Sequence, residues 1–259
     1  MNLYDFSVDY LKKHTMGLTD FVLNDYFKVF KVSSLDEAFE RGVVSVNDNN
    51  KKTMANPIAY FRPERKAAID KILCDFKLES VREKYGDDVE KLWKDLCRQC
   101  VPDSEQSPNG AWYRFAKNII TFAAYLSEFR DIDELYALFE KADSPEEKIK
   151  LVNTVSSRVA QWGFAMAGNW IKDMGMTGYC KPDRHICAII NGIYQTGDDE
   201  KAVFEKVIEV AKQCNVSPFK LDRLLFLVGS GDFYGQGHEN IRKSYNGNEK
   251  EFINLFKAQ

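Results

Sequence analysis

The chain has 259 residues, of which 36 are basic and 39 acidic, so its formal net charge is −3. Because 44% of its residues are hydrophobic and 29% charged, it can bury a large core, which excludes disordered, collagenous and coiled-coil chains. The near-neutral balance also lacks the strong positive field of a non-specific nucleic-acid binder.

No run of the sequence predicts export or membrane insertion. Charged residues from Asp5 to Asp25 interrupt the start of the chain, and no stretch reaches the roughly 18 consecutive apolar residues of a membrane span. The six cysteines are sparse for this length, so we expect reduced thiols. The sequence predicts a cytoplasmic protein without a membrane partner, and we expect a monomer.

Apolar residues recur at helical spacing along the chain, while alternating strand-like runs are nearly absent. Two stripes show this spacing clearly, one early in the chain and one near its middle. Their members are Leu18, Val22, Tyr26, Val29, Phe122, Tyr125, Leu126 and Phe129. The sequence therefore predicts an all-α fold.

Two helix starts carry the spacing of a capping box. Ser34 is followed three residues later by Glu37, and Ser144 by Glu147. In such a box the serine hydroxyl and the glutamate carboxylate each bind a backbone N–H group at the start of the helix. Pro145 adds the residue that is favoured at the first helical position.

Residues 144–191 carry the most information about function. We predict a helix over about 146–159, a turn at Gln161-Trp162-Gly163, a second helix over 164–174 and a third that begins at Asp183. A helix, a tight glycine-containing turn and a helix can hold DNA phosphates through backbone N–H groups, so few basic side chains are needed. The cations expected nearby are Arg158, Lys172, Lys181 and Arg184.

Asp183 stands at the start of the third of these helices, directly after Pro182. Backbone N–H groups and the positive end of the helix dipole keep a carboxylate ionised at such a position. An ionised carboxylate that faces a cleft can stabilise an oxocarbenium ion or orient a water, as cleavage of a base–sugar bond requires. Aspartate is also a preferred N-cap residue, so the alternative is that Asp183 only caps its helix.

Three stretches carry a resemblance to a known family. They are residues 153–165 (NTVSSRVAQWGFA), 181–184 (KPDR) and 215–229 (NVSPFKLDRLLFLVG), with a weaker echo at 110–117 (GAWYRFAK). In this order they resemble the nucleophile helix and turn, the Pro-x-Asp segment and the C-terminal Gly-x-Pro-Pro-x-x-x-Asp-x-x-x-Trp stretch of the helix-hairpin-helix DNA glycosylases. The similarity is most specific to the archaeal-type 8-oxoguanine DNA glycosylase branch.

This resemblance implies an all-α, helix-hairpin-helix glycosylase-like fold with two helical lobes and a cleft between them. We expect residues 1–259 to form one unit. In that unit residues 1–110 are an N-terminal helical part, and residues 111–259 are the helix-hairpin-helix part that carries the site.

In that family a lysine amine attacks the sugar and forms a Schiff base. Alignment on Gly163 puts Asn153 at this position, and asparagine cannot form a Schiff base. Lys150 lies one helical turn earlier and could serve if the helix is shifted, although it could equally be a solvated surface lysine. The chain could also be a monofunctional enzyme in which Asp183 activates water, or Asn153 could be an introduced substitution.

The family reads the flipped base with an aspartate and with an aromatic residue four positions later. Asp222 and Phe226 occupy these positions, and Trp112 matches a further aromatic residue of the pocket. Phe226 and Trp112 could instead belong to the core, because leucines surround Phe226. The resemblance also assigns DNA-backbone contacts to the turn residues Gln161, Trp162, Gly163 and Phe164.

Further candidate sites are weaker. Cys97 and Cys100 have a zinc-like spacing, but on a helix they share a face as buried thiols commonly do, so we expect no metal and no cofactor. We expect an enzyme, a base-excision repair N-glycosylase that removes an oxidised purine such as 8-oxoguanine from damaged double-stranded DNA, with its AP lyase activity left open. An inactive relative that binds damaged DNA and a helical interaction domain are the competing hypotheses.

Overall fold

The computed structural model describes residues 1–48, 63–101, 106–233, 241 and 245–259. All regular secondary structure in these ranges is helical, which confirms the predicted all-α class. None of the helices in the same ranges combines the length and the apolar character needed to cross a membrane.

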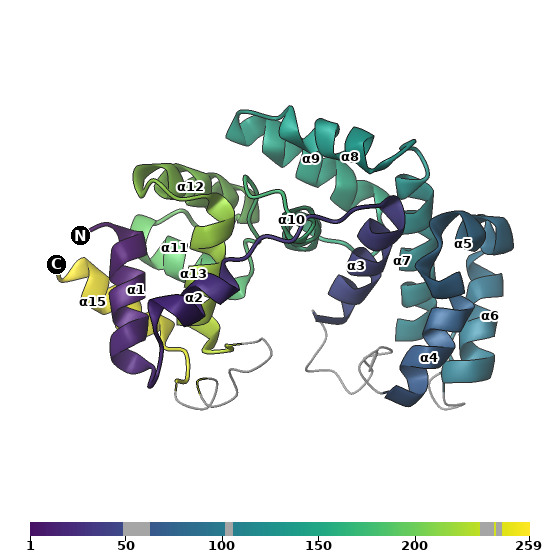
Figure 1. The fold of residues 1–259 in the computed structure, drawn as a ribbon, viewed down its shortest axis with the longest axis horizontal. Coiled ribbons are helices and arrows are strands. Elements are labelled where there is room, and N and C mark those ends of the chain that lie inside the picture. The colour runs from purple at the N-terminus through teal and green to yellow at the C-terminus, as the bar shows by residue number, and fades with distance from the viewer. Residues whose placement is uncertain (49–62, 102–105, 234–240, 242–244) are drawn as a thin grey trace. The chain divides into compact units, whose positions relative to one another are not determined.

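Figure 1 labels the helices along the chain. In order they are α1 (Leu3–His14), α2 (Asp20–Tyr26), α3 (Leu35–Asp48), α4 (Pro63–Ile72), η1 (Cys74–Phe76, a 3₁₀ turn), α5 (Leu78–Tyr85), α6 (Val89–Cys100), α7 (Ala111–Leu126), α8 (Ile132–Glu140), α9 (Pro145–Arg158), α10 (Phe164–Asp173), α11 (Arg184–Tyr194), α12 (Glu200–Gln213), α13 (Pro218–Ser230) and α15 (Glu249–Lys257).

The chain divides into two compact units, each built from distant segments. The first unit comprises residues 1–30, 143–149 and 171–259, and the second comprises residues 31–142 and 150–170. Neither unit ends at residue 110, where we expected the N-terminal part to stop. The boundary crosses α9 after Ile149 and α10 after Trp170, so the predicted helix-hairpin-helix segment contributes to both units. Each unit is described by itself below.

In the first unit, α11 and α13 pack against each other and the neighbouring helices surround them (Figure 1). α11 contacts α12, α13 and α15, while α1 contacts α13 and α15. The inward residues are apolar, and Ile186, Ile189, Leu224 and Leu225 are fully buried. Burial of each such side chain contributes roughly 1.5–3 kcal/mol, so this packing fixes the start of α11 against α13.

In the second unit, α7 contacts α3, α5 and α6. Trp170 of α10 is fully buried, and its ring meets Phe122 of α7 edge-on at a centroid distance of 5.2 Å. Its indole N–H donates to the Ala38 carbonyl at 3.0 Å, so the ring is buried without an unsatisfied donor. This tryptophan therefore ties α10 to both α7 and α3.

Both predicted capping boxes are confirmed. The Glu37 N–H donates to Ser34 Oγ at 3.1 Å, and the Glu147 N–H donates to Ser144 Oγ at 3.2 Å. In return, the Glu37 carboxylate accepts from the Ser33 N–H at 2.8 Å, and the Glu147 carboxylate accepts from the Ser144 N–H at 3.2 Å. α3 and α9 therefore begin where the sequence signals predict.

The stripe over residues 18–29 is only partly helical. α2 covers residues 20–26, with Thr19 accepting from the Val22 N–H at its start. At its end the Tyr26 carbonyl accepts from Arg223 Nη1 at 3.0 Å. Val29 lies beyond the helix and is 42% exposed. The apolar stripe therefore extends beyond the helix, and Arg223 satisfies one of the carbonyls left without a partner at the helix end.

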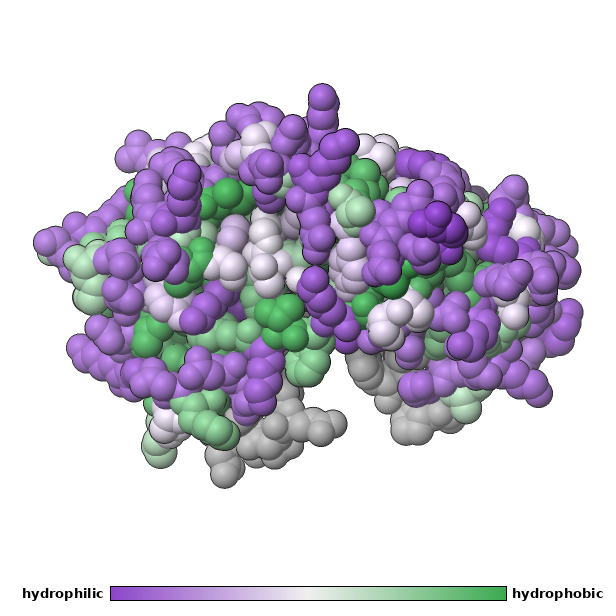
Figure 2. Space-filling view, turned by 45° about the horizontal axis from the view of Figure 1, so that its top comes forward, coloured by the Kyte–Doolittle hydropathy of each residue, from purple (hydrophilic) through white to green (hydrophobic). Residues whose placement is uncertain are grey.

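Polar side chains dominate the molecular face in Figure 2, with smaller apolar areas between them. The exposed large apolar side chains of the described ranges include Met16 and Phe21, which are 82% and 77% exposed. Single exposed apolar residues are common on protein surfaces and do not by themselves indicate a partner.

Gly42 of α3 provides a test of the packing in the second unit. A Cβ atom at this position would lie 2.2 Å from Cε1 of the fully buried Phe122 ring. Although alanine is the better helix former, we expect Gly42→Ala to lower the free energy of unfolding by roughly 1–3 kcal/mol, because the ring has no space to move. Urea denaturation measures this loss.

The matched control is Gly163→Ala, where a Cβ atom meets nothing within 4 Å. We expect this variant to lose less than about 1 kcal/mol, the scale of a weakened N-cap. A larger loss at Gly163 than at Gly42 would contradict the packing described here.

Candidate functional site

The helix, turn and helix predicted from residue 144 onward are present. α9 ends at Arg158, Gln161 adopts a left-handed conformation with φ 68°, and α10 begins at Phe164. Two side chains of α7 hold this turn by its backbone. Asn118 Nδ2 donates to the Ala160 carbonyl at 2.7 Å, and the Ala160 N–H donates to Thr121 Oγ1 at 2.9 Å. The turn is therefore fixed by hydrogen bonds and not only by its own sequence.

The turn residues assigned to DNA contacts divide into two groups. Gln161 and Gly163 are exposed, whereas Trp162 and Phe164 are buried at 5% and 7% exposure. No described residue accepts from the backbone N–H groups of Gly163, Ala165 and Met166 at the start of α10. If the turn binds phosphate, it does so through these N–H groups, because the two aromatic side chains face the core.

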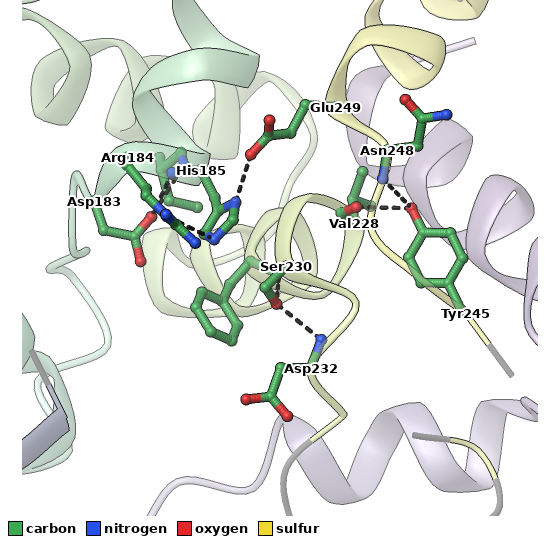
Figure 3. Close-up of polar contacts among 11 residues, drawn as sticks. Asp183, Arg184, His185, Val228, Ser230, Asp232, Tyr245, Asn248 and Glu249 are labelled. Carbon is green, nitrogen blue, oxygen red and sulfur yellow. Dashed lines mark hydrogen bonds and ion pairs between the residues drawn. The ribbon is translucent and has the colours of Figure 1, made fainter. Parts of the chain in front are cut away.

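Asp183 is the N-cap residue of α11, as its position in the sequence predicts (Figure 3). Its Oδ1 accepts from the His185 N–H at 2.9 Å and from the Ile186 N–H at 3.1 Å. None of the described residues donates to Oδ2. The half-buried carboxylate therefore caps the helix with one oxygen and has the second oxygen available for other chemistry.

His185 and Glu249 form a pair beside this carboxylate (Figure 3). His185 Nδ1 contacts Glu249 Oε1, and Arg184 Nε donates to His185 Nε2 at 3.2 Å. Because a guanidinium can only donate, Nε2 must be the accepting nitrogen and the ring proton lies on Nδ1. Sequence reasoning missed this pair, since the two residues are 64 positions apart and no local motif joins them.

Asp222 lies in the interior of the first unit, at 2% exposure. Its Oδ2 accepts from Lys172 Nζ at 2.8 Å, and its Oδ1 accepts from the Lys181 N–H at 2.6 Å. Burial raises the pKa of this carboxyl, and Lys172 opposes that rise. Both of its oxygens are bound in the interior, so Asp222 is not exposed to a flipped base. To recognise a base, as the resemblance implies, the carboxylate would have to leave these two partners.

The two aromatic residues assigned to base stacking differ in exposure. Phe226 is half-buried, and its ring meets the His185 ring edge-on at a centroid distance of 5.9 Å. It therefore lies next to the Asp183 region of the same unit. Trp112 is 1% exposed and packs against Phe115 in the second unit, as expected if it is a core residue. Its ring has no exposed face for a base in this conformation.

The residues weighed as nucleophile lie on α9 within the second unit. Asn153 is half-buried and Lys150 is exposed, which suits a solvated lysine. Lys148 of the first unit is different, because burial lowers its pKa. Its amine donates to the Asp143 carbonyl at 3.1 Å and lies 6.0 Å from the centre of the Tyr179 ring. None of the described lysines of the first unit forms an ion pair with Asp183.

The expected basic patch is smaller than the sequence indicated. Lys172 is 5% exposed and bound to Asp222, and Arg158 is paired with Glu128, so neither is a free surface cation. This corrects the prediction, and the physical reason is that acidic partners distant in sequence bind both groups. Lys181 and Arg184 remain at least partly exposed at the start of α11.

The cysteines are free thiols in the described ranges. Burial raises the pKa of Cys97 and Cys100, which keeps both protonated. Within those ranges no group of three or more His, Cys, Asp or Glu side chains is arranged to hold a metal ion.

The buried pair of Lys172 and Asp222 predicts a large loss of stability when either charge stands alone. We expect Lys172→Met and Asp222→Asn each to lower the free energy of unfolding by about 3–5 kcal/mol, because each leaves an uncompensated polar group in the interior. The double variant should lose less than the sum of the two. Denaturant unfolding of all four proteins gives the coupling energy.

The exposed pair of Lys94 and Glu90 is the control, with an N–O distance of 3.4 Å. Lys94→Met is expected to change stability by less than about 1 kcal/mol. Strict additivity at Lys172 and Asp222 would show that the two charges do not stabilise each other.

Comparisons of the chain with protein families, with curated proteins and with solved structures gave no match. A functional assignment therefore depends on the arrangement of residues within each unit. In the first unit Asp183, His185 and Glu249 gather at the start of α11. In the second unit a hairpin turn has backbone N–H groups without a described acceptor.

Proposed function

We propose that this chain is a DNA N-glycosylase that removes an oxidised purine such as 8-oxoguanine from damaged double-stranded DNA. The observation that carries the proposal is the Asp183 carboxylate, which binds two backbone N–H groups through Oδ1 and has no described donor at Oδ2. Its place after a helix, a turn and a helix also agrees with the resemblance in the sequence.

The chemistry of base removal fits such a carboxylate. When a base leaves, positive charge develops on the sugar, and an ionised oxygen close to the anomeric carbon stabilises it. The N-terminal end of α11 presents two backbone N–H groups to the Asp183 side chain. Because Oδ1 is fixed by the helix, Oδ2 is held in one direction and needs little reorganisation during the reaction.

DNA contacts in this proposal come mainly from backbone groups. The N–H groups of Gly163, Ala165 and Met166 suit a phosphate, and Lys181 and Arg184 add positive charge near Asp183. Since the net charge is only −3 and few cations are available, we expect binding that is weak and sensitive to salt. Phe226 is the aromatic residue that we assign to the flipped base, because its ring is the more exposed of the two candidates.

The residues near the proposed site favour hydrolysis of the base–sugar bond by water over attack by a lysine. Asn153 cannot form a Schiff base, and none of the described lysines of the first unit is paired with Asp183. Lys148 is the lysine to test, since its lowered pKa gives it more of the neutral amine that such a reaction requires.

Substitution of Asp183 separates its capping role from its chemical role. Asparagine is as good an N-cap as aspartate, so Asp183→Asn should leave stability nearly unchanged and lower the rate of 8-oxoguanine release by about 100-fold through loss of the charge. Asp183→Ala should lose both the activity and about 1 kcal/mol of stability. Single-turnover base release and thermal unfolding give the two readouts.

Asp199 offers a matched control, because it caps α12 and accepts from the Lys201 N–H at 3.0 Å. Asp199→Asn is expected to keep the full rate. If Asp183→Asn also keeps it, Asp183 is only a helix cap. Retained binding to damaged DNA without base release would instead favour the inactive relative, and no affinity for DNA at low salt would favour a helical interaction domain.

Borohydride trapping on an oligonucleotide with 8-oxoguanine tests for a lysine nucleophile. We expect base release without a covalent adduct, because hydrolysis forms no Schiff base. An adduct that disappears in Lys148→Ala or in Lys150→Ala would identify the nucleophile and contradict the hydrolytic form. Lys181→Ala is the control for a general loss of positive charge near the site.

A further inference from the structure

We infer that His185 is the proton acceptor of this hydrolytic reaction and that Glu249 is the residue that positions it. The inference rests on the proposed function and deepens it, since it says how water is activated without a lysine. Two contacts of the ring carry it. His185 Nδ1 contacts the Glu249 carboxylate, and His185 Nε2 accepts a hydrogen bond from Arg184, so Nε2 carries the lone pair.

The His185 ring lies at the same helix start as the Asp183 carboxylate. His185 follows Asp183 by two residues in the first turn of α11, and its own backbone N–H bonds the Asp183 side chain. Figure 3 shows the two side chains at the same helix start, with Arg184 next to both. When a carboxylate accepts the hydrogen bond from Nδ1–H, the Nε2 lone pair is left as the base, the arrangement by which imidazoles remove protons in hydrolases.

The ring is held on several sides. The His185 side chain is only 14% exposed, and Glu249 of α15 is 30% exposed. Phe226 meets the ring edge-on from α13, and a Cβ atom at Gly229 would lie 2.8 Å from His185 Cβ. The imidazole therefore has little freedom to turn, so Nδ1 and Nε2 keep distinct roles.

The charged groups around the imidazole come from two helices. They are Asp183 at the N-cap of α11, Arg184 in its first turn and Glu249 on α15. The groups facing the ring from α13 are Phe226 and Gly229, which do not titrate, and no described charged residue of α12 forms an ion pair with His185. Glu249 is thus the carboxylate that stabilises the imidazolium once a proton is taken up.

Arg184 covers Nε2 in the free protein, and its side chain is exposed. A guanidinium binds an anionic phosphate more strongly than the uncharged Nε2 of an imidazole, because the phosphate bond joins opposite charges and can use two N–H groups. Binding of DNA would therefore draw Arg184 away and uncover the lone pair.

The step balances without a further reactant. A water oxygen forms a bond to C1′ while the C1′–N9 bond breaks, and the electron pair of that bond leaves with the purine. The proton of the water passes to Nε2 of His185 and then to the departing base, while Asp183 Oδ2 stabilises the charge on the sugar.

Single-turnover release of 8-oxoguanine from a duplex, measured over a range of pH, tests the inference. We expect the wild-type rate to fall on the acid side as the base is protonated. His185→Asn should lower the rate by about 100-fold and remove this acid limb. Glu249→Gln should lower the rate by about tenfold and alter the acid limb, because the amide replaces the carboxylate that holds Nδ1–H and orients the imidazole.

The control for Glu249→Gln is Glu251→Gln, in the same first turn of α15, where the carboxylate accepts from Asn248 at 2.9 Å. It should keep the wild-type rate and pH profile. Because His185 is partly buried, thermal unfolding checks each variant, and the partly exposed Glu249 provides the test if His185→Asn does not fold.

The outcomes separate this inference from the proposed function. If the wild type releases the base and depends on Asp183, but Glu249→Gln keeps the wild-type rate and acid limb, the inference is overturned and the proposed function stands. If the wild type releases no base from any oxidised purine, the proposed function fails and the inference fails with it.

Discussion

The first unit depends on one buried carboxylate. Asp222 binds Lys172 at the end of α10 with one oxygen and the backbone of Lys181 with the other, so it ties α13 to the end of α10 and to the connector that follows it. The bond to Lys181 fixes the connector two residues before Asp183. Since a carboxylate in the interior is stable only when it is paired, the charge of Lys172 is what allows Asp222 to hold that connector. The connector that leads to Asp183 is therefore held by a buried ion pair.

Capping and chemistry are compatible at Asp183. From the sequence, Asp183 could be either a helix cap or a reactive carboxylate, and the two roles stand as alternatives. The two oxygens divide these roles, since Oδ1 makes both capping bonds and Oδ2 has no described donor. The two backbone N–H groups that Oδ1 satisfies also hold the carboxylate in one orientation. Capping by Oδ1 thus orients Oδ2 for the catalytic role that we propose for Asp183.

Features with local signals could be predicted well from the sequence. The all-α class, the boxes at Ser34 and Ser144, the order of α9, turn and α10, and Asp183 at the start of α11 all depend on residues within a few positions of one another. The contacts of the candidate site are different, because Lys172 and Asp222 are 50 positions apart and His185 and Glu249 are 64 apart. Such pairs depend on how helices pack, which no local spacing encodes. For the same reason Trp112 could not be told from a pocket residue until its burial was known.

The glycine at position 229 shows what the close approach of α11 and α13 requires. Glycine inside a helix costs about 0.5–1 kcal/mol relative to alanine, because the unfolded chain has more freedom to lose. At this position any side chain would collide with the Cβ atom of His185. The chain accepts a weaker helix in exchange for a short distance between two backbones. An attempt to stabilise α13 by the usual replacement of glycine would therefore push the imidazole away from its carboxylate, so thermal stability and the geometry of this site are in competition at one residue.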